Sequence, residues 1–148
     1  MKFVKPMKTV SSRLSGEIMA QLEEIDSRPT ISAQAAIEVF VYLRRSTLHE
    51  LRGRFSREEI IALADSFNGL TPTWQVMCNT AVFVAHTEDA EKYKSLASDN
   101  GADPLVLIEK IKQLTSAQAS VLQLELWAFW NRNDNAKPDI EVLIKSLS

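Results

Sequence analysis

The stretch 72–85, PTWQVMCNTAVFVA, decides the fold class of this chain. Thr71 precedes it as an N-cap whose hydroxyl can accept from a backbone N–H, and Pro72 stands in the first turn, where its missing N–H had no partner. Apolar side chains recur at helical spacing and also occupy the other faces of the segment. Because a helix that is apolar nearly all round needs burial on several sides, we predict that 72–85 is the central helix of a small helical domain.

Two amphipathic segments with their own start and stop signals come before this stretch. Ser15 is placed to cap a helix that runs to about Asp26, and this helix has a predicted buried stripe of Ile18, Leu22 and Ile25. A second helix begins at a cap on Thr30 or Ser32 and can run to Leu51, with Gly53 as its stop. The wide apolar face predicted for burial on this second helix comprises Ile37, Phe40, Val41, Leu43, Leu48 and Leu51.

Further signals surround the central stretch on both sides. Ser56 and Glu59 have the spacing of a capping box, and Asn68-Gly69 ends the helix that the box opens. After the stop at Asn100-Gly101, helices are predicted to start at Asp103-Pro104, at Thr115 for the stretch to Trp130, and at Pro138-Asp139. The segment from His86 to Asp89 is either a short break or a polar continuation of the central helix toward Leu96.

The predicted architecture is therefore one all-α domain of seven or eight helices over residues 15–148, built around 72–85. An arm of residues 1–14 precedes it and is flexible or strand-like. Within the arm, residues 8–14 alternate, with Val10, Ser12 and Leu14 on one side, which is the periodicity of a short strand.

Composition narrows the compartment and the class. At 148 residues and 45% hydrophobic content, the chain fits one domain with a real core. The single cysteine excludes a disulfide framework and a cysteine zinc site, and it fits a reducing compartment. The longest apolar run, 81–85, is far shorter than the ~20 residues that cross a bilayer, and no apolar block follows the N-terminal lysines as it does in a secretory signal. We expect a cytoplasmic protein without a membrane partner.

The net charge of −2 conceals an asymmetry along the chain. Residues 1–54 hold nine Lys and Arg against six Asp and Glu, whereas residues 55–148 hold eight against thirteen. The basic N-terminal third is therefore the candidate region for an anionic partner such as a nucleic acid, with ordinary solvated surface as the alternative.

Catalytic and metal-binding patterns are poorly represented. Cys78 and His86 are eight residues apart, roughly 12 Å of helical rise, which is too far for a nucleophile and its base to form a hydrogen bond. His49 and His86 each lie near acids, but neither stands in an H-E-x-x-H or E-x-x-H spacing. No glycine-rich phosphate loop occurs. We predict no catalytic, cofactor or metal site, and we keep an enzyme as the third alternative, which a third ligand beside His86 and a carboxylate would support.

The aromatic cluster of Trp127, Phe129 and Trp130 is the most conspicuous local feature. Three large rings within four residues cannot all face one side of a helix, so at least one points toward a surface or a partner. Trp and Phe are enriched at the buried centres of interfaces. We predict a protein interface on these three residues, with burial between neighbouring helices as the alternative.

The segment Lys8-Thr9-Val10-Ser11-Ser12-Arg13-Leu14-Ser15, followed by Glu17, Leu22 and a second helix, resembles the ribbon-helix-helix DNA-binding domain. In that family a short strand pairs with its twin across a dimer and enters the major groove, which admits a two-stranded ribbon. The resemblance covers roughly the first third of the chain. It implies base or phosphate contacts from Thr9, Ser11 and Arg13, with Lys8 alongside.

The remainder of the chain is similar to small helical proteins of bacteria, through Leu51 to Ser56, Phe67 to Gly69 and Leu126 to Trp130. That resemblance implies a free-standing bacterial protein. The sequence thus favours a non-catalytic protein that acts through protein–protein association, as a homo-oligomer or with another protein. The alternative is a dimeric DNA-binding transcriptional regulator that uses the N-terminal ribbon.

Overall fold

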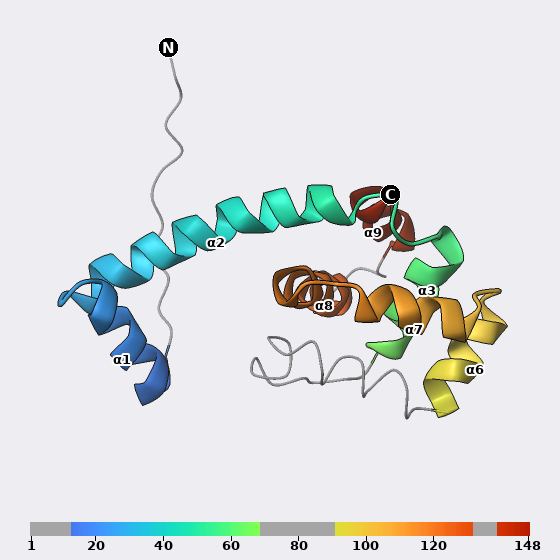
Figure 1. Ribbon diagram of the computed structural model, residues 1–148, viewed down its shortest axis with the longest axis horizontal. Coiled ribbons are helices and arrows are strands. Elements are labelled where there is room, and N and C mark those ends of the chain that lie inside the picture. The colour runs from blue at the N-terminus through green and yellow to red at the C-terminus, as the bar shows by residue number, and fades with distance from the viewer. Residues whose placement is uncertain (1–12, 69–90, 132–138) are drawn as a thin grey trace, which may run out of the picture. The chain divides into compact units, whose positions relative to one another are not determined.

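The computed structural model describes residues 13–68, 91–131 and 139–148 (Figure 1). Every regular element within these ranges is an α-helix, which confirms the predicted all-α class. The predicted central helix, 72–85, and the first part of the predicted strand, 8–12, lie outside the described residues. The described helices are α1 (Gly16–Ile25), α2 (Pro29–Leu51), α3 (Arg57–Ser66), α6 (Glu91–Asp99), α7 (Pro104–Lys112), α8 (Ser116–Asn131) and α9 (Ile140–Leu147).

The chain divides into two compact units, Met1–Val41 and Tyr42–Ser148. The division falls inside α2, which is one continuous helix of 23 residues. The arm of residues 1–14 and the single helical domain of residues 15–148 stay predictions.

The described core of the second unit is centred on α8. Eight of its 16 residues are buried, the largest number in any described helix, and they form one wide face. Helices α3 and α9 pack against α8, and α6 packs against α3 and α7. Figure 1 shows these five helices gathered together. The fully enclosed apolar side chains of this core include Leu51, Ile60, Leu63, Leu107, Ile111, Leu122, Leu126, Leu143 and Leu147.

Most predicted start signals act as expected. The Ser15 hydroxyl accepts from the backbone N–H of Ile18, and the Asp103 carboxylate accepts from the first backbone N–H groups of α7. Ser56 and Glu59 form the predicted capping box. The helix ends also agree with the sequence, since Gly53 and Gly101 take φ values of 74° and 77°, which favour glycine.

The predicted start of α2 is wrong by a few residues. The helix begins at Pro29, whose fixed φ suits the first helical position, and not after Thr30 or Ser32. The Asp26 carboxylate accepts from the backbone N–H of Arg28 just ahead of it. The Ser32 hydroxyl is used differently, because it donates to the carbonyl oxygen of Asp26 at 3.0 Å and ties α2 to the end of α1.

Candidate interaction surfaces

The described part of the first unit has almost no core of its own. Among residues 13–41, only Leu22 and Ser32 are buried. The predicted buried stripe of α1 is therefore wrong at two of its three positions, because Ile18 and Ile25 are 48% and 66% exposed. The large apolar side chains that this unit exposes are Leu14, Ile18, Ile25, Ile31, Ile37, Val39, Phe40 and Val41.

The densest part of this surface belongs to an exposed apolar run of α2, residues 37–43, which continues past Val41 to Tyr42 and Leu43. Six of its seven residues are large and apolar, with exposed fractions from 45% to 72%, and only Glu38 is charged. They surround the helix instead of forming one stripe. The sequence predicted that the wide apolar face of α2 is buried. That prediction is correct only near the C-terminal end of the helix, where Leu51 is buried and Leu48 is half-buried. An apolar surface of this kind on a helix typically marks an interaction site.

The predicted aromatic interface lies against the core of the second unit. Phe129 is buried, and its ring meets that of Trp130 edge to face with centroids 4.9 Å apart. The Trp130 indole N–H donates to the carbonyl oxygen of Ala64 in α3 at 2.8 Å, and Trp127 is half-buried beside the same core. These contacts hold the three rings within the unit and leave Trp127 and Trp130 partly accessible. An interface on these residues stays a prediction.

The residues implied by the ribbon-helix-helix resemblance are described only in part. Lys8, Thr9 and Ser11 lie outside the described residues. Arg13 is exposed, in non-helical backbone immediately before the Ser15 cap of α1. Its guanidinium is therefore accessible to an anionic partner.

Two of the arginines in and just after the basic third form ion pairs with acids far along the chain. Arg44 Nε donates to Glu125 of α8 at 2.6 Å, and Glu125 is almost fully buried. Arg57 pairs with Glu141 of α9, where both side chains are exposed. Hydrogen bonding to Arg57 lowers the pKa of Glu141, and the carboxylate in turn raises the pKa of Arg57. These arginines therefore hold helices together, which reduces the positive charge left for a partner.

Two buried acids were missed by the sequence analysis. Glu125 is enclosed in α8, and Glu59 is enclosed between its capping box and Lys110 of α7, whose ammonium lies 2.7 Å from the carboxylate. The only sequence signal was the Ser56 to Glu59 spacing, which predicts the cap but not the ion pair with α7.

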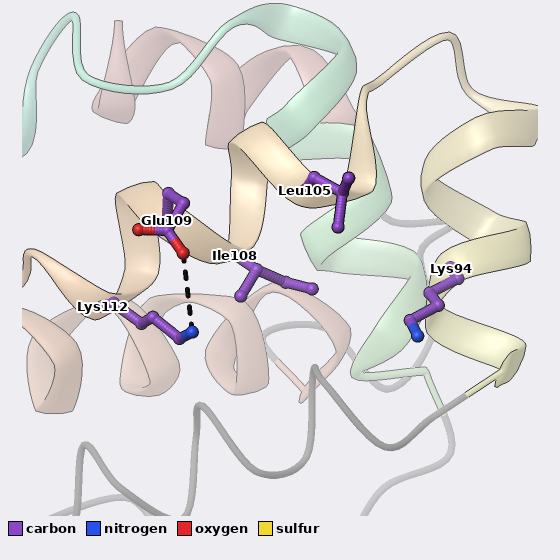
Figure 2. Close-up of a pocket in the computed structure, with 5 residues that line it drawn as sticks. All are labelled: Lys94, Leu105, Ile108, Glu109 and Lys112. Atoms are coloured by element: carbon purple, nitrogen blue, oxygen red, sulfur yellow. Dashed lines mark hydrogen bonds and ion pairs between the residues drawn. The ribbon is translucent and has the colours of Figure 1, made fainter.

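A shallow pocket of about 480 Å³ lies between α6 and α7 (Figure 2). Leu105 and Ile108 give it an apolar lining, and Lys94 stands at the opposite side from Lys112. Lys112 pairs with Glu109 at 3.5 Å. The pocket is therefore lined by two apolar and three charged side chains.

The histidines and the cysteine add no described site. His49 is exposed in the last turn of α2, and both Cys78 and His86 lie outside the described residues. Within the described ranges, no three His, Cys, Asp or Glu residues are grouped so that they could hold a metal ion. In the same ranges, no helix has the length and apolar character that crossing a membrane requires.

Comparison with known proteins does not place the chain in a family: no family model matches it, and neither a curated protein nor a solved structure is significantly similar to it.

Proposed function

We propose that this chain is a non-catalytic cytoplasmic protein that acts through protein–protein association and works as a homo-oligomer. The exposed apolar surface of the first unit is the observation that carries the proposal. Its described residues bury one large apolar side chain, Leu22, and expose eight. A helical unit with so little enclosed surface gains its stability from packing against another surface.

The free energy available from this surface is large enough for association. Complete burial of a Val, Ile, Leu or Phe side chain contributes about 1.5–3 kcal/mol, so a half-exposed side chain still offers about 1 kcal/mol. Association has to overcome an estimated 4–15 kcal/mol of lost freedom. In a homodimer both copies contribute, so covering most of the eight side chains in each offers about 12–16 kcal/mol. With the association cost at the lower end of its range, the surplus reaches the roughly 8 kcal/mol of a micromolar Kd.

Sedimentation equilibrium of the full chain from about 1 to 100 μM tests the proposal. We expect a species larger than the monomer. Val41→Asp places a charge in the exposed apolar run, at a side chain that is 45% exposed, and is expected to shift the protein toward the monomer. Leu105→Asp is the matched control, because Leu105 is 70% exposed on α7 of the other unit. A wild-type chain that is monomeric at every concentration would contradict the proposal.

The predicted aromatic interface has a separate test. If Trp127, Phe129 and Trp130 mediate association, Trp130→Ala retains the helical circular dichroism and weakens association. Association that is unchanged in this variant while Val41→Asp abolishes it assigns the contact to the first unit instead.

A dimeric DNA-binding regulator is the second candidate function. The favouring observation is the arrangement at the start of the first unit, where exposed Arg13 in non-helical backbone leads directly into the Ser15 cap, α1 and α2. Binding to a fluorescent mixed-sequence duplex at low and moderate salt tests it, because phosphate contacts make the affinity fall steeply as salt rises. Arg13→Ala should weaken binding, whereas Lys94→Ala, an exposed lysine of the second unit, should not. No binding at low salt contradicts this function.

A further inference from the structure

The face of α2 that contains Glu38, Val41, Tyr42 and Arg45 has a charge pattern suited to self-recognition. These positions follow the i, i+3, i+4, i+7 spacing, so they form one stripe about 10 Å long. All four side chains are exposed, with Val41 at 45% and Tyr42 at 72%. The stripe therefore has an acid at one end, two apolar side chains in its middle and a base at the other end.

The charged ends of the stripe are available to a partner. Glu38 accepts a hydrogen bond from the neutral Gln34 amide at 3.2 Å, and no described residue forms an ion pair with its carboxylate. No described residue forms an ion pair with Arg45, unlike its neighbour Arg44, which is bound to Glu125. The two charges are separated by two helical turns, too far to neutralise each other within the helix.

We propose that this stripe binds the same stripe of a second copy, with the two α2 helices antiparallel about a two-fold axis. The inference rests on the proposed function, to which it adds the surface and the partner. In a two-fold contact the same patch is used on both chains. Antiparallel pairing centred between Val41 and Tyr42 brings each Glu38 opposite Arg45 of the second copy, and each Val41 opposite Tyr42 of the second copy.

The charges select this arrangement over the other simple one. A parallel pairing of the two stripes places Glu38 beside Glu38 and Arg45 beside Arg45, and like charges across an interface disfavour association. The full chain carries a net charge of only −2, so two copies repel each other weakly over long distances.

Charge exchange in the full chain tests both the surface and the direction of the helices. Glu38→Arg and Arg45→Glu each create two like-charge contacts per dimer, and we expect each to raise the dimer Kd at least about tenfold in sedimentation equilibrium. The double variant restores opposite charges in both contacts, so its Kd should return to within about threefold of the wild type. Both replacements are good helix formers at exposed positions, so α2 itself should be retained.

The matched control is Glu23→Arg, which makes the same charge change at an exposed glutamate of α1. It should leave the Kd unchanged. A dimer whose Kd responds to neither single exchange overturns this surface and leaves the proposed association intact. Single variants that weaken the dimer without rescue in the double variant overturn the antiparallel pairing, whereas a monomeric wild type overturns the proposed function and the surface together.

Discussion

Removal of the Glu59 carboxylate is expected to destabilise the second unit. Glu59 accepts from the backbone N–H of Ser56 at 2.8 Å, and both of its oxygens accept from Lys110 Nζ, at 2.7 and 2.9 Å. Its side chain is 6% exposed, whereas that of Lys110 is 35% exposed. One carboxylate therefore caps α3 and joins it to α7.

The magnitude follows from these contacts. Loss of the cap costs about 1 kcal/mol, and a hydrogen bond to a charged group contributes about 1.5–3 kcal/mol. Removing one partner of a fully buried pair costs about 3–5 kcal/mol, but the Lys110 ammonium can turn toward water when its partner is lost. We therefore expect Glu59→Ala to lower the free energy of unfolding by about 2–4 kcal/mol. Glu59→Gln, which can still accept from the Ser56 N–H, should cost about 1–2 kcal/mol.

Urea unfolding followed by tryptophan fluorescence measures this loss. All three tryptophans lie in the unit Tyr42–Ser148, so the signal reports on the unit that contains Glu59. Glu58→Ala is the control, since Glu58 is exposed in the same helical turn and should change the stability by no more than about 0.5 kcal/mol. Equal effects of the Glu59 and Glu58 substitutions would refute the argument that the enclosed carboxylate joins α3 to α7.

Three further predictions concern single contacts. Gly53→Ala should lower the free energy of unfolding by about 1 kcal/mol in urea, through backbone strain alone, because φ is 74° and no atom lies within 4 Å of an added Cβ. Gly16→Ala is the control, since that position is equally open but has no positive φ, and this change should be neutral or stabilising. Trp130→Phe removes the indole N–H that donates to a carbonyl oxygen of α3, and it should lower the free energy of unfolding by about 1–3 kcal/mol in the same assay. An unchanged free energy of unfolding would mean that water replaces this hydrogen bond at no cost. Arg57 lowers the pKa of Glu141 below its ordinary value of 4.5, so this pair stabilises the fold at pH values above 4.5, and its contribution is lost as the pH falls through the lowered pKa. In Arg57→Gln, NMR titration should show that the pKa of Glu141 rises toward 4.5. An unchanged pKa in this variant would contradict the pairing.

Local signals predicted the local structure well. The capping box from Ser56 to Glu59, and the caps at Ser15, Asp103 and Asp139, depend on residues two or three positions apart and are visible in any short window of sequence. The start of α2 was missed because two candidate caps follow Pro29, and only the structure shows that Ser32 donates backward to Asp26.

Long-range pairing could not be predicted from the same windows. Arg44 and Glu125 are 81 positions apart, and nothing near either residue identifies the other as its partner. The exposure of the apolar run on α2 was equally hidden. Periodicity shows that residues such as Phe40 require burial, but it does not distinguish burial within one chain from burial against a second chain. The candidate surface therefore became visible only with the exposure of each side chain in the structure.

The continuity of α2 across the division between the two units has a consequence for proteolysis. Arg44 and Arg45 lie within a few residues of the division at Val41, so trypsin has two potential cleavage sites there. Proteases cut most readily at exposed loop tips and termini, whereas these two peptide bonds belong to a hydrogen-bonded helix. Limited digestion of the native protein should therefore not separate the two units at their own boundary, and fragments that end at Arg44 or Arg45 would report that this part of α2 opens.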